Sequence, residues 1–213
     1  MQTFTNTAGS YIVDKLILKI QENKQYLSDI DGLIGDGDHG INMNKGFSMC
    51  REELDKDPGD LYHGLKVLSK ILMMKIGGSM GPLYGKFFEA MALTLKGRNE
   101  IGIEDIGYAL KAGVEAIASI SPAKVGDKTL MDTLIPAISA YEKACSEGKS
   151  FSQALEDMKT AAQIGRDSTK EMVAKIGRAS RLGERSRGVL DAGAVSCCII
   201  LETIADSAQE LLK

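Results

Sequence analysis

Apolar residues recur at three- and four-residue intervals along almost the whole chain, and this period limits the fold more than any other feature. Ile12, Leu16 and Ile20 follow it near the N-terminus, and Leu65 and Leu68 follow it further on. Such spacing places apolar side chains on one face of a helix. No run alternates apolar and polar residues in the way that is typical of a half-buried strand. The sequence therefore predicts an all-α fold.

Glycine clusters and turn residues divide this pattern into eight expected helices. They are expected at residues 9–28, 40–56, 60–76, 81–97, 102–120, 130–147, 150–176 and 191–212. Their connections are short, which favours antiparallel neighbours. A chain of 213 residues without internal repeats is also an ordinary length for one domain. We therefore expect residues 1–213 to form a single-domain, antiparallel up-and-down barrel or bundle.

The connections between the expected helices are of two alternating kinds. The second, fourth and sixth, which begin at Asp57, Gly97 and Glu147, contain turn-forming residues and little else. The first, third, fifth and seventh concentrate aspartate, glycine, lysine and arginine. Antiparallel helices bring the odd-numbered connections out at one end of the molecule. Helix order alone therefore predicts a functional site at that end.

Composition excludes several classes of protein. The chain is 44% hydrophobic and 26% charged with a net charge of −3, which argues against a general nucleic-acid or membrane-surface binder. No apolar run approaches the roughly 18 residues of a membrane span, and the N-terminus does not resemble a signal peptide. We therefore expect a cytoplasmic protein. The four cysteines lack metal-binding spacing and are expected in the core.

The first connection holds three aspartates within eight residues, Asp31, Asp36 and Asp38. A single Asp-Gly pair would be interpreted as a turn that caps the next helix. Carboxylates about 4 Å apart, however, repel each other by roughly 4 kcal/mol per pair at an effective dielectric constant near 20. A hard cation such as Mg²⁺, bound by oxygen ligands and shared with phosphate oxygens, would relieve that repulsion. The cluster therefore predicts a metal site.

Two other motifs resemble this connection but do not fit it. Gly35, Gly37 and Gly40 have the spacing of a dinucleotide-binding loop, which must follow a strand, whereas the preceding segment here has helical periodicity. An EF-hand beginning at Asp36 would need a glutamate at the position of Phe47. Two interpretations of the first connection therefore remain: a carboxylate site for Mg²⁺, which the three aspartates favour, and a simple capped turn.

The third and fifth connections each allow two interpretations. Gly77–Gly81 is either a helix end followed by a tight turn or a group of N–H donors for an anion at a helix N-terminus. In the fifth connection, Lys128 could steady a phosphate, Asp127 a metal-bound water, and Thr129 could cap the next helix. The alternative for that connection is a capped turn with a solvated lysine.

The seventh connection is rich in glycine and carries four arginines, at positions 178, 181, 185 and 187. A solvated basic loop is the usual explanation of such a run. Here the loop is expected to face the acidic connection, so recognition of a phosphate or nucleotide is the alternative interpretation. Asp191 follows and is well placed to cap the last helix.

Four motifs occur in one order along the chain. They are Asp31-x4-Asp36-x-Asp38-His39-Gly40-x-Asn42-Met43, Gly77-Gly78-x-x-Gly81-Pro82-Leu83-x-Gly85, Gly126-Asp127-Lys128-Thr129 and Gly177-Arg178-Ala179-Ser180-x-Leu182-Gly183-Glu184-Arg185-Ser186. Together they resemble the nucleotide-binding L subunits of dihydroxyacetone kinases, over essentially the whole chain. The order of four motifs makes this resemblance far more specific than any single motif.

The resemblance implies an eight-helix barrel that holds ADP or ATP at one end, with two Mg²⁺ ions on catalytic Asp31, Asp36 and Asp38. It also implies a set of nucleotide-binding residues. These are His39, Gly40, Ile41, Asn42, Ser79, Met80, Ser121, Leu130, Arg178, Asp191, Ala192 and Gly193. Met80 and Ala192 depart from many members, which carry a small hydroxyl residue and a proline there. These differences bear on the phosphate contacts and the base pocket.

The resemblance further implies partners. In the family, a separate K subunit holds a small ketose covalently through a histidine, and the L subunit supplies the γ-phosphoryl group. In one branch a phosphotransferase-system M subunit rephosphorylates bound ADP; in the other, free ATP exchanges. A homodimer or a heteromeric complex is expected. The alternatives are a kinase subunit for a four-carbon ketose such as erythrulose and a non-catalytic, ADP-binding regulatory subunit.

Overall fold

A computed structural model describes residues 2–213 and confirms the all-α fold class. The helices in that range are α1 (Ser10–Glu22), α2 (Lys24–Ile34), α3 (His39–Leu54), α4 (Leu61–Lys75), α5 (Met80–Leu95), α6 (Ile103–Ala118), α7 (Met131–Ser146), α8 (Phe151–Ser168) and α9 (Ala192–Leu211). Two 3₁₀ segments, η1 (Thr169–Glu171) and η2 (Arg178–Ser186), and two strands, β1 (Thr3–Thr5) and β2 (Glu100–Gly102), complete the fold.

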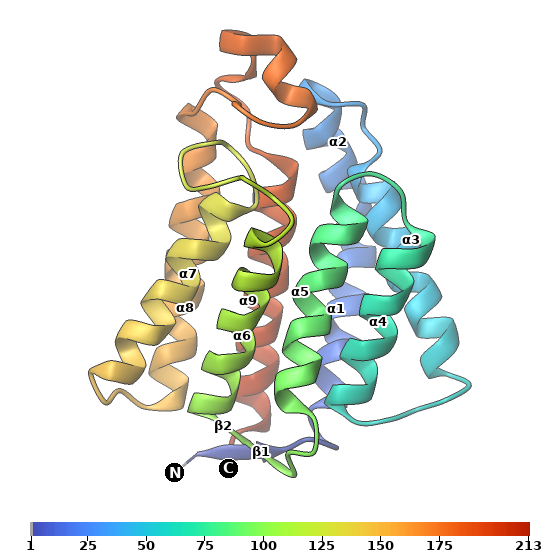
Figure 1. Cartoon of the computed structure of the whole chain (residues 1–213), viewed down its shortest axis with the longest axis vertical. Helices are drawn as coiled ribbons and strands as arrows, with labels where there is room; N and C mark the ends of the chain where they lie inside the picture. Colours follow the sequence, from blue (N-terminus) through green and yellow to red (C-terminus); the bar gives the residue numbers. More distant parts are fainter. Residues whose placement is uncertain (1) are drawn as a thin grey trace.

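The helices form a closed antiparallel barrel. In the order α1, α3, α4, α5, α6, α7, α8 and α9, each packs against the next, and α9 returns to pack against α1 (Figure 1). Aromatic rings fill part of the interior: the ring centroids of Phe87 and Phe88 are 5.3 Å apart, and those of Phe47 and Phe88 are 6.3 Å apart. Full burial of one such side chain stabilises the fold by about 1.5–3 kcal/mol.

The number of helices differs from the prediction, because two separate helices are present where one was expected at residues 9–28. Helix α1 ends at Glu22 and α2 begins at Lys24, with Asn23 between them. The Asn23 side chain donates to the carbonyl of Lys19 at 2.9 Å, which satisfies the end of α1 and interrupts the helix. Helix α2 then continues beyond α1 toward the end of the barrel where η2 also lies (Figure 1). Asp31 therefore lies on a helix rather than in a loop.

The expected seventh helix, at residues 150–176, is also too long. Helix α8 ends at Ser168, and η1 follows it directly. The last part of the expected helix, residues 169–176, thus belongs to the connection with α9. That connection is therefore longer than the glycines alone indicated.

The pair of short strands was not predicted from the sequence. Strand β1 pairs antiparallel with β2, and Phe4 lies opposite Ile101. Both side chains are buried. Three residues per strand are too few for an alternating pattern to stand out. The pair crosses the end of the barrel near both termini, opposite to α2 and η2 (Figure 1).

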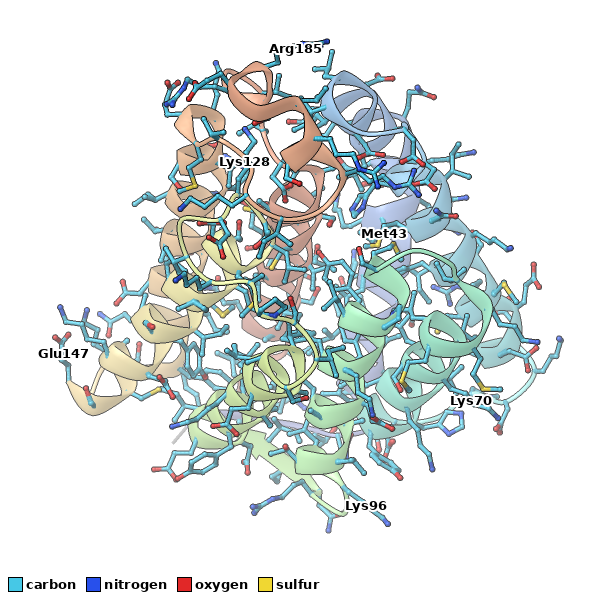
Figure 2. All side chains as sticks on the ribbon, turned by 45° about the horizontal axis from the view of Figure 1, so that its top comes forward. Met43, Lys70, Lys96, Lys128, Glu147 and Arg185 are labelled. Atoms are coloured by element: carbon cyan, nitrogen blue, oxygen red, sulfur yellow. The ribbon has the colours of Figure 1, made fainter. Side chains whose placement is uncertain are left out.

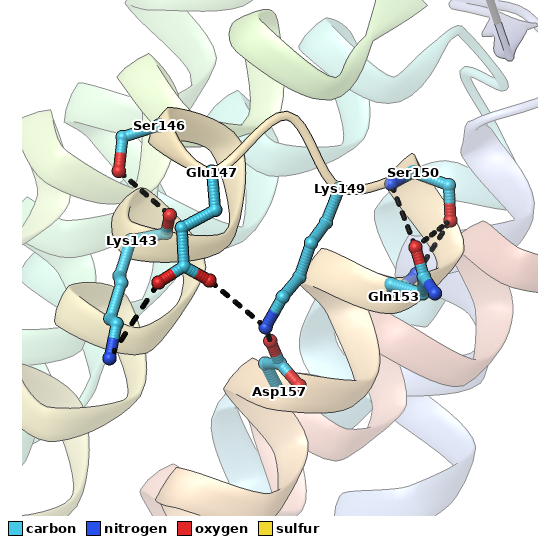
Figure 3. Close-up of polar contacts among 7 residues, drawn as sticks. All are labelled: Lys143, Ser146, Glu147, Lys149, Ser150, Gln153 and Asp157. Carbon is cyan, nitrogen blue, oxygen red and sulfur yellow. Dashed lines mark hydrogen bonds and ion pairs between the residues drawn. The ribbon is translucent and has the colours of Figure 1, made fainter.

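The α7–α8 turn lies at the end of the barrel opposite to α2 and η2, here called the closed end (Figure 1 and Figure 3). Ser150 accepts the N–H of Gln153 at 3.2 Å, and the Gln153 side chain accepts the N–H of Ser150 at 3.1 Å. Nearby, the Lys149 ammonium pairs with Glu147 at 3.2 Å and with Asp157 at 2.8 Å. This capping box and its exposed ion pairs use only residues of the turn and the adjoining helix. The sequence prediction of a plain turn is thus sufficient here.

Two simpler features complete the fold. Cys50, Cys197 and Cys198 are buried, Cys145 is half-buried, and all four are free thiols, in line with the expectation of core residues. Among residues 2–213, no helix combines the length and the apolar character needed to cross a membrane.

Candidate functional site

The odd-numbered connections converge at one end of the barrel, as helix order predicted. They surround a cavity of about 290 Å³, to which the first, third, fifth and seventh connections all contribute residues. This volume is near the lower end of the range of about 300–1,000 Å³ that is typical of small-molecule sites. The cavity is therefore large enough to bind part or all of a small ligand.

The three aspartates of the first connection lie together at this cavity. One carboxylate oxygen from each of Asp31, Asp36 and Asp38 lies within 4.8 Å of the others. Asp31, near the end of α2, accepts the N–H of His39 at 3.3 Å, which ties α2 to the first residue of α3. Asp38 occupies the N-cap position of α3, but its side chain accepts no capping hydrogen bond. Its carboxylate therefore remains available for a ligand.

The charges of this cluster are not balanced. Arg178 at the start of η2 donates to the Asp36 carboxylate from a position 142 residues along the chain. Among the described residues, the ion pair between Arg178 and Asp36 is the only one that involves this cluster. One positive charge therefore lies beside three negative charges. The available donors are all carboxylate oxygens, which are the ligands that a hard divalent cation such as Mg²⁺ takes. The residues present therefore fit such an ion.

The third connection lies beside this cluster and opens toward the cavity. Gly77, Gly78 and Ser79 are exposed, and added Cβ atoms at the two glycines would meet nothing within 4 Å. Gly78 has a φ of +74°, which suits a tight turn, and Ser79 is the N-cap residue of α5 but forms no side-chain capping hydrogen bond. The two interpretations of this connection thus coexist: a turn ends α4, and the uncapped N-terminus of α5 favours an anion.

The start of α9 forms another wall of the cavity. Asp191 accepts the N–H of Ala194 at 2.8 Å, which confirms the predicted cap. Burial raises the pKa of Asp191 to about 7, although this N–H and the Lys128 ammonium act in the opposite direction. Ala192 and Gly193 also line the cavity.

A buried chain of hydrogen bonds joins His39 to α9 and α5. His39 Nε2 is 2.9 Å from the Ser196 hydroxyl, which is 2.7 Å from the Tyr84 hydroxyl. Ser196 also donates to the carbonyl of Gly193 at 3.1 Å. Burial lowers the pKa of His39, and the charge of Asp31 opposes that effect. The orientation of the His39 ring is therefore fixed from the interior of the barrel.

Tyr84 and Ser196 were not among the residues predicted for the site. Tyr84 lies within the glycine motif of the third connection but was treated as a variable position, and Ser196 lies on an apolar helix. The available signal was the hydroxyl group of each, because a buried hydroxyl needs a partner. Ser196 lies 157 residues from His39 and 112 residues from Tyr84, so local spacing could not identify these partners.

Lys128 matches neither interpretation given from the sequence. Its side chain is 1% exposed, so it is not solvated. Its Nζ donates to the carbonyl oxygens of Thr169 at 2.8 Å, Met172 at 3.2 Å, Ser186 at 2.7 Å and Val189 at 2.5 Å. The ammonium group is thus occupied by the backbone of the seventh connection rather than being free to hold a phosphate.

The neighbours of Lys128 also hold the backbone. Asp127 accepts the N–H of Lys124 at 3.0 Å and pairs with Lys175 at 3.7 Å, and it does not line the cavity. The expected role of Asp127 beside a metal-bound water is therefore not supported. Thr129 accepts the N–H of Met131 at 3.2 Å, which gives it part of the capping role that was expected.

All the predicted site residues line the cavity except Gly40 and Ile41. Gly40 lies at the contact of α3 with α2, where an added Cβ would come within 2.0 Å of the Lys24 carbonyl oxygen. This glycine is needed for helix packing. Ile41 is 52% exposed and lies outside the cavity lining.

Comparisons with known proteins agree with this geometry. Residues 33–206 match the model of the DAK2 domain. The chain is 37% identical over 190 residues to the ADP-binding subunit DhaL of the PEP-dependent dihydroxyacetone kinase of Escherichia coli strain K12, covering 87% of this chain and 89% of that protein. It is 40% identical over 189 residues to the ADP-binding subunit DhaL of the PTS-dependent dihydroxyacetone kinase of Lactococcus lactis subsp. lactis strain IL1403, covering 88% and 90%.

The fold also matches a solved structure, that of the dihydroxyacetone kinase from C. freundii in complex with AMP-PNP and Mg²⁺. The TM-score is 0.70 at 23% identity, and the match covers 93% of this chain and 33% of that one. This chain thus spans about a third of the solved chain. The structural class of this chain is thus an antiparallel helical barrel with clustered carboxylates at one end. Within it, the chain belongs to the DAK2-domain family, in its DhaL type.

Proposed function

We propose that this chain is the nucleotide-binding subunit of a dihydroxyacetone kinase, a phosphotransferase that moves a γ-phosphoryl group to a small ketose. The observation that carries the proposal is the cluster of Asp31, Asp36 and Asp38, whose oxygens lie within 4.8 Å at the cavity that Arg178 also lines. A cluster of this kind suits a Mg·nucleotide better than it suits a ligand without metal. The names of the related ADP-binding subunits support the same assignment.

In this proposal, Asp31, Asp36 and Asp38 are the metal ligands, and two Mg²⁺ ions are expected. Magnesium bound there would bridge the carboxylates to the phosphates and neutralise the charge that develops during transfer. The Arg178 guanidinium would exchange its bond with Asp36 for charge-assisted hydrogen bonds with a phosphate. His39, held by Ser196, would keep a fixed orientation beside the same phosphates.

The rest of the cavity would position the nucleotide. The predicted phosphate-side residues are His39, Gly40, Ile41, Asn42, Ser79 and Met80. Ser121 and Leu130 are predicted to flank the nucleotide, and Asp191, Ala192 and Gly193 to complete its pocket with Arg178. The free N–H groups at the start of α5 suit the phosphates, because a helix N-terminus attracts anions. Leu130 and Ala192 are buried and apolar, which suits the face of a base. Positioning and charge neutralisation supply most of what phosphoryl transfer requires.

The ketose would be held on a separate K subunit, covalently through a histidine of that subunit. Residues 1–213 would thus act as one nucleotide-binding domain of a heteromeric, cytoplasmic enzyme. The phosphate would come either from a phosphotransferase-system M subunit acting on bound ADP or from exchanging ATP; relatives of this chain include a PEP-dependent and a PTS-dependent kinase subunit. Erythrulose is the alternative ketose, because some relatives are named erythrulose kinases.

Two measurements test the proposal. Calorimetric titration of the purified chain should detect binding of Mg·ADP, and EDTA should abolish it. The chain mixed with ATP or a phosphate donor and dihydroxyacetone should form no sugar phosphate until a K subunit is added. Absence of Mg·ADP binding would overturn the nucleotide-binding assignment. Robust turnover by the chain alone would overturn the division of labour between subunits.

A further inference from the structure

Residues 169–190, here called the cap segment, connect α8 to α9 and lie over the site end of the barrel (Figure 1). The cap segment contains η1, η2 and Arg178, and many of its residues are exposed. Arg178 reaches the carboxylate cluster from this segment. The position of its guanidinium therefore depends on what holds the cap segment in place.

Lys128 contacts the cap segment near both of its ends. Its Nζ donates to the carbonyls of Thr169 and Met172 at the beginning and to those of Ser186 and Val189 near the end. In Figure 2, Lys128 lies inside the molecule beneath the cap segment, and Arg185 lies at its outer edge. The buried Lys128 ammonium thus joins the two ends of the cap segment, and most of η2 lies between them in the sequence.

The four partners of Lys128 require an ammonium ion. A protonated lysine offers three N–H donors and no acceptor, and backbone carbonyls can only accept. A neutral amine would direct its lone pair at one of these oxygens. A neutral side chain of similar length at this position would leave buried carbonyls without a donor, which is unfavourable.

Lys128 itself is rigidly held. Its φ of +62° is in the left-handed region, and no other non-glycine residue from 2 to 213 has a positive φ. The Asp132 carboxylate accepts the N–H groups of Gly126 at 2.5 Å and Thr129 at 2.7 Å, which fixes the loop on both sides of Lys128. The surrounding bonds thus maintain an unfavourable backbone conformation that aims the side chain at the cap segment.

We propose that Lys128 is a positioning residue, whose ammonium gathers the two ends of the cap segment and thereby holds Arg178 over the carboxylate cluster. This inference rests on the proposed function, because it concerns the arginine assigned to the nucleotide. It differs from a role in binding phosphate directly, since the Nζ already has four carbonyl partners. Lys128 would then act on nucleotide affinity through Arg178.

A double-mutant cycle distinguishes these two roles. Mg·ADP affinity is measured by calorimetry for the wild type, Lys128→Met, Arg178→Ala and the double variant. We expect Lys128→Met alone to weaken binding by roughly tenfold. In the Arg178→Ala background, the same change should cost less than about threefold, because residues that act through one contact are not additive. Losses that multiply would show that Lys128 contacts the nucleotide independently and would overturn the inference.

Hydrogen exchange and a matched control complete the experiment. Amide exchange at residues 176–186, without nucleotide, should be faster in Lys128→Met than in the wild type. Lys124→Met changes an exposed lysine of the same connection and should alter neither exchange nor affinity. Unchanged exchange and affinity in Lys128→Met would also overturn the inference.

A second variant covers the case in which Lys128→Met does not fold. Lys128→Arg keeps the positive charge and several donors, so it should fold and show intermediate exchange and affinity, with the same non-additivity toward Arg178→Ala. Losses in this variant that multiply with those of Arg178→Ala would count against positioning. Failure of the wild type to bind Mg·ADP would instead contradict the proposed function, which separates the two failures.

Discussion

The two ends of the barrel use lysine in opposite ways. At the closed end, Lys149 lies at the surface and pairs with Glu147 and Asp157, which are two and eight residues away (Figure 3). At the site end, Lys128 is buried and donates to carbonyls 41 to 61 residues away. The α7–α8 turn at the closed end is therefore held by local contacts, whereas the connections at the site end are held by contacts with distant parts of the chain.

The two ends also differ in charge balance. Around the α7–α8 turn, each carboxylate has a cation nearby: Glu147 contacts Lys143 at 3.7 Å and Lys149, and Asp157 contacts Lys149. At the site end, Asp36 pairs with Arg178, whereas Asp31 and Asp38 form no ion pair among the described residues. Exposed ion pairs such as those of the closed end contribute little to stability. The unbalanced cluster, in contrast, has the charge and the oxygen donors that fit a divalent cation, so in the proposed function substitutions at the two ends should have different effects on nucleotide binding.

The largest effect on nucleotide affinity is expected for Asp36→Asn. The change removes one ligand charge from the cluster, so Mg·ADP affinity should fall by about a hundredfold or more, equivalent to at least about 2.7 kcal/mol. Calorimetric titration measures the affinity, and circular dichroism should show an unchanged helical fold. Asp157→Asn is the matched control at the closed end and should bind normally. Wild-type affinity in Asp36→Asn would sink the metal assignment.

Arg178→Ala should have the next largest effect. A guanidinium that hydrogen-bonds to a phosphate contributes about 1.5–3 kcal/mol, so the loss should be roughly ten- to a hundredfold. Arg178→Lys should recover only part of it, because lysine keeps the charge but lacks the planar fork. Thermal unfolding without nucleotide should change little, and the stabilisation by Mg·ADP should shrink.

Arg185→Ala is a matched control on the same cap segment, since Arg185 is exposed and forms no ion pair among the described residues. It should leave affinity unchanged. Equal losses in the two arginine variants would mean that the general charge of the cap segment, rather than the contact of Arg178, attracts the nucleotide.

Ser196→Ala should have a smaller effect. It removes the hydroxyl that joins His39 to Tyr84 and leaves the imidazole without this partner. Loss of one hydrogen bond costs about 1 kcal/mol, so Mg·ADP affinity should fall about fivefold. Ser207→Ala, a buried serine further along the same helix, is the control and should bind as the wild type does. Full affinity in Ser196→Ala would mean that the orientation of His39 does not matter for binding.

The smallest effect on affinity, none at all, is expected for Ser150→Ala at the closed end. The substitution removes the N-cap of α8 and should lower the free energy of unfolding by about 1 kcal/mol. Urea denaturation measures the stability, and calorimetry measures the affinity. Reduced Mg·ADP affinity in this variant would show that the two ends of the barrel are energetically coupled.

The sequence alone determined the features that depend on nearby residues. Helical periodicity identified the helices, and their parity brought the acidic, glycine-rich and basic connections to one end. The Asp191 cap was predictable because its partner, Ala194, is three residues away. The carboxylate cluster was predictable because Asp31, Asp36 and Asp38 are separated by no more than one helix end and a short loop.

Only the tertiary structure decided the contacts between distant segments. The β1–β2 pair, the bond of Ser196 with His39 and the four partners of Lys128 each join connections or helices that are far apart in sequence. The residues next to a lysine in the sequence do not show whether its ammonium group will lie in solvent or against buried carbonyls, because those carbonyls come from distant parts of the chain. A polar side chain that is buried away from water must find a hydrogen-bond partner within the protein. Which partner it finds depends on the packing of the whole folded molecule.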